Sequence, residues 1–303
     1  MPTPFLISPD SSVAPPAFFQ PCVLAKLRGL RPLALAVLAA AALFSAACGA
    51  EKTTVPAGTL EPDKLLFERG TEALSKKRWI TAREYFRQIV EGYPQSPYRA
   101  TAKLSLGDAY LGENTAESLV LAINEFNEFL TFYPTHERAD YAQLKLAMCH
   151  HVQMAKPERD QTETKEAIRE FDHFFERFPN SSLMPEARAR YREARDRLSE
   201  SEYRVGLFYY RARWYPGAID RLKGVLKQDP EFSRRDAVYY YLAESLLLVN
   251  QQAEALPYFE RLLAEVPNSE FQEQARKRVA ELKATASVPK PPADAPPSKP
   301  GHR

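Results

Sequence analysis

Three neighbouring residues, Cys149, His150 and His151, form the one cluster in the sequence whose side chains could hold a metal ion. Successive side chains on a helix point about 100° apart, so this cluster cannot close around one ion from a single helix. No two of the five histidines have the i, i+4 spacing that a helical zinc site uses. We therefore expect no metal site and interpret the cluster as a helix end near a loop.

Catalytic motifs are equally absent from the sequence. It contains no G-x-S-x-G nucleophile turn, no Walker phosphate loop and no glycine-rich dinucleotide fingerprint. Carboxylate pairs such as Glu125 with Glu128 have the spacing of ordinary solvated helix faces. The sequence therefore predicts a protein that is not an enzyme and that carries no cofactor apart from a covalent lipid, discussed below.

Charge limits the possible partners further. The chain has 41 Lys and Arg residues against 39 Asp and Glu residues, so its net charge of +2 provides no general attraction for nucleic acid. Five arginines between Arg188 and Arg197 alternate with acidic residues, which favours i, i+3 and i, i+4 ion pairs on an exposed helix. The aromatic runs 208–210 and 239–241 favour packing between helices, with a peptide-binding surface as the alternative.

The amino-terminal segment has the features of an export signal. Lys26, Arg28 and Arg31 precede an uncharged apolar run over residues 33–47, which is too short to span a bilayer comfortably. Cys48 follows two alanines and resembles the lipid-modified cysteine of bacterial lipoproteins. We predict a signal peptide over residues 1–47 and a lipid on Cys48, with simple cleavage nearby or a retained anchor as alternatives. Residues 1–21 are proline-rich, so a translation start near Val23 is a further alternative.

Two segments lack the apolar residues that a folded core needs. Residues 48–62 are polar and predict a lipidated flexible tether, and residues 284–303 predict a disordered proline-rich tail. Cys22 would be lost with the signal, so Cys149 is the single cysteine left besides Cys48. A disulfide is therefore not expected, and Cys149 is interpreted as a small core residue.

Residues 63–283 contain a five-fold repeat. In each copy a large apolar residue follows an alanine by four positions and a proline comes eight positions later. The copies are Ala82-Phe86-Pro94, Ala122-Phe126-Pro134, Ala167-Phe171-Pro179, Ala218-Leu222-Pro230 and Ala255-Phe259-Pro267. This is the second-helix pattern of a tetratricopeptide repeat, in which alanine allows close helix packing and proline ends the helix.

The spacing of the repeats also predicts where they differ. Small residues such as Gly70 and Gly206 lie 12 positions before the alanine and mark the first helix of a pair. Wider spacing predicts longer loops near residues 112–115 and 157–164. Residues 183–201 have helical spacing and run on toward Trp214, which predicts one continuous helix of about 30 residues. Pro257 should kink its helix or delay its start. The predicted fold is all-α, a solenoid of five helix-turn-helix repeats with an enlarged third repeat and a carboxy-terminal capping helix.

Several motifs resemble one known family. Tyr93-Pro94-x-x-Pro97-Tyr98, Pro134-Thr135-His136 with Asp140-Tyr141, Arg177-Phe178-Pro179-Asn180-Ser181 and Glu202-Tyr203-x-Val205 with Tyr209-Tyr210 occur in that order. Together with Cys48 and five repeats, they resemble the BamD (ComL) family of tetratricopeptide lipoproteins. The resemblance covers about residues 65–230, and the fifth repeat agrees only with tetratricopeptide repeats in general.

This resemblance implies a scaffold of the outer membrane β-barrel assembly complex. Members of the family sit on the periplasmic face of the outer membrane, bind the periplasmic domains of the BamA insertase and receive unfolded β-barrel proteins; other lipoproteins of the complex are possible partners. The substrate pocket carries over to Tyr93, Pro94, Pro97, Tyr98 and Tyr141. The contact with the insertase carries over to Arg221, on the second helix of the fourth repeat.

Two other protein classes remain as alternatives. The first is a periplasmic tetratricopeptide scaffold that couples cell-wall synthesis to envelope constriction, similar to the CpoB/YbgF group. Those proteins usually carry an amino-terminal coiled coil, and residues 49–62 are too short and too proline-rich for heptads. The second is a tetratricopeptide arm on a hydrolytic enzyme, but the sequence leaves no segment for a catalytic domain.

Overall fold

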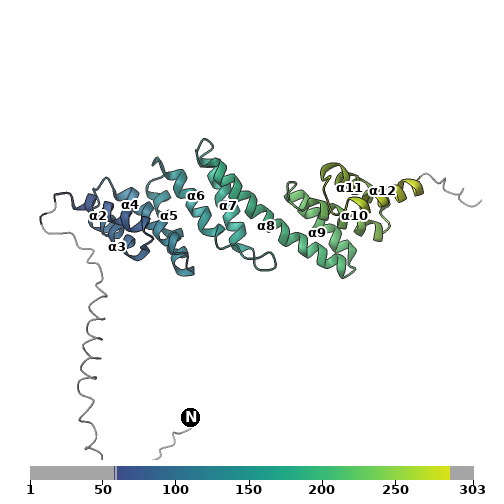
Figure 1. Ribbon diagram of the computed structural model, residues 1–303, viewed down its shortest axis with the longest axis horizontal. Coiled ribbons are helices and arrows are strands. Elements are labelled where there is room, and N and C mark those ends of the chain that lie inside the picture. Colours follow the sequence, from purple (N-terminus) through teal and green to yellow (C-terminus); the bar gives the residue numbers. More distant parts are fainter. Residues whose placement is uncertain (1–57, 59, 287–303) are drawn as a thin grey trace, which may run out of the picture. The chain divides into compact units, whose positions relative to one another are not determined.

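The computed structural model describes Gly58 and residues 60–286, and every regular element in those residues is an α-helix (Figure 1). The helices are α2 (Pro62–Ser75), α3 (Trp79–Gly92), α4 (Arg99–Glu113), α5 (Ala116–Phe132), α6 (Ala139–His151), α7 (Thr162–Arg177), α8 (Met184–Arg211), α9 (Tyr215–Gln228), α10 (Arg235–Leu248), α11 (Gln252–Glu265) and α12 (Gln272–Ala286). Each helix packs against the next one along the chain, which confirms the predicted all-α solenoid. The predicted signal peptide, Cys48 and residues 287–303 lie outside the described residues.

Five helices end two residues before a proline, as the repeat spacing predicts. Helices α3, α5, α7, α9 and α11 end ahead of Pro94, Pro134, Pro179, Pro230 and Pro267. A proline disfavours helical geometry in the residue before it, so the helix stops there. That intervening residue still donates its backbone N–H to the carbonyl four residues earlier, as Tyr93 does to Ile89 at 3.0 Å.

The alanine and phenylalanine positions of the repeat lie at the centre of the core. All five alanines and the five large residues that follow them are fully buried. Glycines on the preceding helix make room for these rings, because a Cβ added at Gly70 would lie 2.7 Å from Phe86 and one at Gly107 would lie 2.7 Å from Phe126. The two helices of a pair therefore approach closely at the position where the first helix has no side chain.

The enlarged third repeat has the long loop and the long helix that the sequence predicts, but the loop begins five residues earlier and ends three residues earlier than predicted. Helices α6 and α7 are joined by residues 152–161, and α8 is a single helix of 28 residues. Near its start, Tyr191 packs edge-on against Phe175 of α7 with ring centroids 5.2 Å apart. Near its end, Gly206 faces Leu222 of α9. One long helix thus joins the third repeat to the fourth.

The predicted long loop in the second repeat is wrong. Gly112 belongs to α4, and two residues, Asn114 and Thr115, separate α4 from α5. The extra residues lengthen both helices instead, to 15 and 17 residues. Asn114 ends α4 in the left-handed conformation at φ 56°, and the Thr115 hydroxyl accepts a hydrogen bond from the Ser118 backbone N–H.

The carboxy-terminal end of the array is closed by α12. Ala275 is fully buried, and Phe271, Val279 and Leu282 pack against the same apolar cluster, as a capping helix requires. This helix runs to Ala286, three residues past the predicted end of the array. Pro257 lies inside α11, which begins at Gln252, so the proline does not delay the start of that helix.

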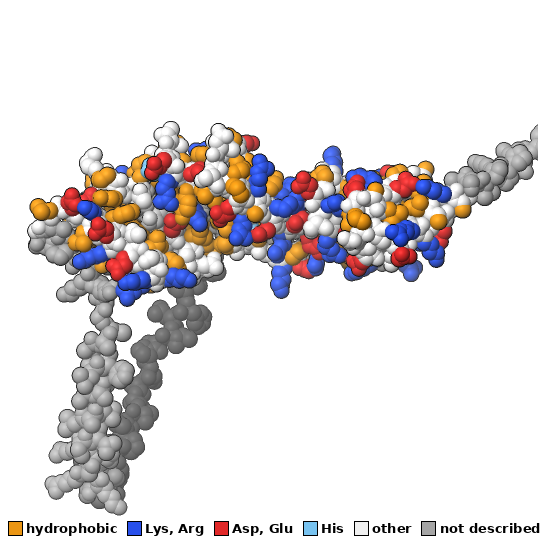
Figure 2. Space-filling view, turned by 45° about the horizontal axis from the view of Figure 1, so that its top comes forward, with side chains coloured by type: hydrophobic (Ala, Val, Ile, Leu, Met, Phe, Trp, Pro, Cys, Tyr) orange, Lys and Arg blue, Asp and Glu red, His pale blue; other side chains and the backbone are white. Residues whose placement is uncertain are grey.

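The described surface is mixed in charge. On the face that Figure 2 shows, basic and acidic side chains are interspersed over the helices. Among residues 58 and 60–286, no helix combines the length and apolar character needed to cross a bilayer. The described part of the chain is therefore a helical array with a surface of mixed charge.

Candidate peptide- and partner-binding surfaces

The first inter-repeat turn holds four of the predicted pocket residues together. Tyr93 follows α3 directly and Tyr98 precedes α4, so the turn is fixed at both ends. The ring of Tyr98 stacks on Phe67 of α2 with centroids 5.1 Å apart. Pro94 and Pro97 between them are exposed to solvent. This turn therefore offers a rigid surface of two tyrosines and two prolines.

Tyr141, the fifth predicted pocket residue, lies on α6 and is occupied by other contacts. Its hydroxyl donates a hydrogen bond to Asp108 of α4 at 2.9 Å, and the Arg138 guanidinium lies over its ring, 4.4 Å from the centroid. Burial raises the pKa of Asp108, and this effect outweighs the hydrogen bond from Tyr141, which lowers the pKa. Asp108 is ten residues beyond Tyr98, or about 15 Å along α4. The structure does not bring Tyr141 into contact with the turn residues.

Arg221, the predicted insertase contact, lies on α9 and is accessible. Its side chain is 51% exposed, and its guanidinium donates a hydrogen bond to Glu202 of α8 at 3.2 Å. This ion pair holds the arginine in place without removing it from solvent. A carboxylate on another protein could therefore share the guanidinium or replace Glu202.

The three residues of the Cys149–His151 cluster have separate environments in the structure. His150 pairs with Glu163 at 2.8 Å, His151 lies 3.1 Å from Glu193, and Cys149 is buried. Burial raises the pKa of the Cys149 thiol to about 12, so the thiol stays protonated. Within the described ranges, no group of three or more His, Cys, Asp or Glu side chains could hold a metal ion.

The aromatic runs pack as helix neighbours. Tyr239 is buried and donates its hydroxyl hydrogen to Glu265 at 2.8 Å. Tyr240 stacks on Phe271 with ring centroids 4.6 Å apart, and Tyr241 packs against the same phenylalanine. Packing between helices is confirmed for these tyrosines, of which Tyr240 and Tyr241 remain half-buried. Phe208 is the exception, because 65% of its surface is exposed.

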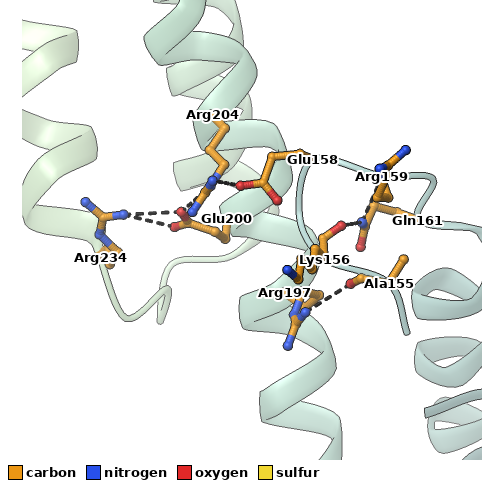
Figure 3. A network of polar contacts seen from close by, with 9 residues as sticks. All are labelled: Ala155, Lys156, Glu158, Arg159, Gln161, Arg197, Glu200, Arg204 and Arg234. Atoms are coloured by element: carbon orange, nitrogen blue, oxygen red, sulfur yellow. Dashed lines mark hydrogen bonds and ion pairs between the residues drawn. The ribbon is translucent and has the colours of Figure 1, made fainter. Parts of the chain in front are cut away.

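A groove that the sequence did not indicate lies beside the middle of α8. Its volume is about 980 Å³, and its walls come from α6, the 152–161 loop, α8 and the turn that follows α9. Figure 3 shows the polar network at its edge, in which Arg204 pairs with Glu158 and Glu200, and Arg234 also reaches Glu200. Burial raises the pKa of the Glu200 carboxyl, which sits between these two arginines.

Arginines on α8 also tie the long loop in place. Arg197 donates a hydrogen bond to the backbone carbonyl of Ala155 at 3.0 Å (Figure 3). Arg190 makes the predicted i, i+3 pair with Glu193, at 3.1 Å. Arg192 makes an i, i+4 pair with Asp196 at 3.0 Å. Arg192 and Arg197 also reach residues more than 35 positions away, Asp229 and Ala155. The prediction of ion pairs on an exposed helix is therefore only partly right. Some arginines of the run also bind residues outside α8, and the spacing of charges along one helix cannot reveal those partners.

Comparisons with known proteins agree with this fold. A family model described as an outer membrane lipoprotein, YfiO, matches residues 60–248, and a tetratricopeptide repeat model matches residues 237–269. The chain is 29% identical over 221 residues to the outer membrane protein assembly factor BamD of Caulobacter vibrioides, covering 73% of this chain and 71% of that protein. It is 27% identical over 205 residues to the assembly factor BamD of Vibrio cholerae, covering 64% and 82%. Because the family model matches well over half of its length, this chain belongs to the YfiO family of outer membrane lipoproteins.

Proposed function

We propose that this protein is a non-catalytic scaffold of the outer membrane β-barrel assembly machinery. A lipid on Cys48 holds it at the periplasmic face of the outer membrane, where it binds the periplasmic domains of a BamA-like insertase and unfolded β-barrel proteins. The observation that supports this role is the match of the YfiO model over residues 60–248, together with curated relatives that are BamD assembly factors.

The substrate surface in this proposal is the turn from Tyr93 to Tyr98. Tyrosine rings and proline side chains offer apolar faces to an extended peptide without requiring a particular sequence. Asp108, which accepts a hydrogen bond from the Tyr141 hydroxyl, lies about 15 Å further along α4 than Tyr98 by helix rise. An extended peptide rises about 3.3 Å per residue, so roughly five residues could bridge the turn and Tyr141. The proposed pocket is therefore an extended track rather than a closed cavity.

The insertase contact in this proposal centres on Arg221. Half of its side chain is exposed, and Glu202 fixes its position before the partner arrives. A preorganised arginine loses less conformational freedom on binding than a mobile one. A carboxylate on the insertase is the complementary group.

Purification of the tagged protein in mild detergent tests the proposed role. Recovery of a BamA-like insertase is the expected result. Recovery of cell-wall synthases without the insertase would overturn the proposal and favour the cell-wall scaffold instead.

Photo-crosslinking tests the substrate surface separately. Pro97 is exposed, and its neighbours in the turn can still bind substrate when it is replaced. A photoreactive residue at this position should therefore crosslink to unfolded β-barrel proteins in cells. The matched control carries the same residue at exposed Pro216, on α9. Equal crosslinking at both positions would show that the turn is not the substrate surface.

A further inference from the structure

The turn between α8 and α9 carries an exposed group of aromatic and basic side chains. Phe208 is 65% exposed and Trp214 is 55% exposed. Arg211 and Arg213 between them are also exposed, and neither makes an ion pair with any carboxylate in the described residues. We call these four residues the RW turn. Many other arginines of the array pair with acidic groups, and several more bind backbone carbonyls or lie over aromatic rings, whereas Arg211 and Arg213 lie beside two exposed rings.

Trp214 is held rigidly although it is exposed. Its ring meets Tyr209 edge-on with centroids 4.7 Å apart. A Cβ added at Gly217 would lie 2.5 Å from the indole, so the absence of a side chain at Gly217 creates the seat for the ring. The backbone N–H of Trp214 donates to the carbonyl of Tyr209 at 2.9 Å. One face of the indole is therefore packed, and the rest of the ring is presented to solvent in a fixed orientation.

The backbone of this turn does not account for its arginine. Arg213 has a left-handed conformation at φ 61°, and the equivalent turns of the first and fifth repeats hold Lys77 at φ 57° and Asn250 at φ 62°. Asparagine adopts this conformation far more readily than arginine. Lys, Arg and Asn all occupy this position in the array, so the backbone does not require an arginine here, and the exposed guanidinium of Arg213 is free to bind a group outside the chain.

We propose that the RW turn docks on the anionic headgroups of a phospholipid bilayer. Tryptophan and arginine are suited to this task, because an indole ring settles at the level of the headgroups and a guanidinium binds phosphate through two parallel hydrogen bonds. None of the four residues lines the groove beside α8. Phe208 and Arg211 lie in the last turn of α8, and Arg213 and Trp214 follow it, so the four exposed side chains lie within seven residues of the chain.

This contact supplies the fourth repeat with its own attachment to the membrane. A lipid anchor on a flexible tether holds the protein at the membrane without fixing its orientation, and a second, electrostatic contact adds to the attachment. The RW turn lies more than 150 residues after Cys48, so it would fix the orientation of the array rather than duplicate the anchor. The inference goes beyond insertase and substrate binding and requires neither of them.

Tryptophan fluorescence tests the proposal on the full-length protein, because the chain has only two tryptophans, Trp79 and Trp214. The Trp79→Phe variant leaves Trp214 as the sole reporter. This protein is incorporated into nanodiscs of phosphatidylcholine alone or of phosphatidylcholine mixed with phosphatidylglycerol, each with and without brominated acyl chains. In the anionic discs, Trp214 emission should shift to shorter wavelength and the brominated chains should quench it at least threefold more than in neutral discs.

Two variants and a control decide the role of the arginines. Arg211→Gln with Arg213→Asn keeps a residue suited to the left-handed position, and Arg211→Glu with Arg213→Glu reverses both charges. Both should reduce quenching in anionic discs to the level of neutral discs, with unchanged helical circular dichroism. The control, Lys227→Glu with Lys277→Glu, reverses two exposed charges elsewhere and should quench like the parent.

Three results would overturn the proposal. Trp214 emission and quenching that are the same in both kinds of disc would show that the turn does not meet anionic lipid. Unchanged quenching in the arginine variants would remove the arginines from any such contact. A shift that appears only when the purified periplasmic domains of the insertase are added would identify the RW turn as a protein-binding surface.

Discussion

The carboxylate of Asp229 binds the guanidinium of Arg192 across the junction between the third and fourth repeats. Nη1 of Arg192 donates to Oδ1 at 2.8 Å, and the Ser199 hydroxyl donates to Oδ2 at 2.6 Å. The Asp229 side chain is 3% exposed and directly follows α9, whereas both donors lie on α8. One buried carboxylate therefore joins the end of the fourth repeat to the middle of the longest helix.

Replacing Asp229 by Asn should destabilise the array. The substitution leaves the Arg192 charge without its buried partner, which costs about 2–4 kcal/mol of unfolding free energy. Urea unfolding followed by circular dichroism measures the loss. Asp220→Asn, at an exposed site on α9, is the control and should change the unfolding free energy by less than about 0.5 kcal/mol. Equal losses in both variants would show that the Asp229 network contributes no stability.

The same carboxylate predicts a pH dependence. Burial alone would raise the pKa of Asp229, but the hydrogen bonds from Arg192 and Ser199 outweigh it and lower the pKa below its usual 3.8. A carboxyl group with a lowered folded-state pKa stabilises the protein above its unfolded-state pKa and loses this effect as the pH falls. The stability gap between the parent and Asp229→Asn should therefore narrow between pH 7 and pH 3. A gap of constant size would contradict this assignment.

Two glycines in the fourth repeat should respond to alanine in opposite ways. A Cβ at Gly206 would lie 2.7 Å from Cδ2 of the fully buried Leu222, so Gly206→Ala should cost about 1–3 kcal/mol of unfolding free energy. A Cβ at Gly224 would meet no atom within 4 Å, so Gly224→Ala should stabilise α9 by up to about 1 kcal/mol. Thermal unfolding of the two variants compares them directly. A stability change of the same sign in both would mean that Gly206 is not the close approach point.

Sequence reasoning located the repeats well because their signal is local. Each proline fixes a helix end by steric exclusion. Pro94 and Pro230 therefore mark the carboxy-terminal ends of α3 and α9. The short turn in the second repeat carries a local signal too, in Asn114, but the wider spacing between repeats fits a longer loop as well as it fits longer helices.

Contacts between distant residues could not be predicted in this way. Arg192 and Asp229 are 37 positions apart, and an arginine run on one helix is compatible with many partners. Similarly, nothing in the sequence near Tyr141 reveals that Asp108 occupies its hydroxyl. The sequence predicts an exposed helix face for Arg192 and a substrate pocket for Tyr141, whereas their actual partners depend on how adjacent helices pack.

Reversing the charge of Arg221 should weaken the proposed complex with the insertase. Arg221→Glu places a carboxylate beside Glu202 and opposite the acidic group expected on the partner, so affinity should fall at least tenfold. Lys227→Glu, on the same helix, is the matched control and should bind like the parent. Titration with the periplasmic domains of the insertase measures both, and circular dichroism should show unchanged helix content. Equal affinity of the two variants would place the interface elsewhere.

Depletion of the protein from cells tests the central claim most directly. The measurement is the fraction of outer membrane β-barrel protein that is folded, determined by its heat-dependent migration on denaturing gels. If the protein is a scaffold of barrel assembly, the folded fraction should fall within a few generations, and restoring the intact protein should recover it. Cells that keep a normal folded fraction after the protein has disappeared would contradict the account.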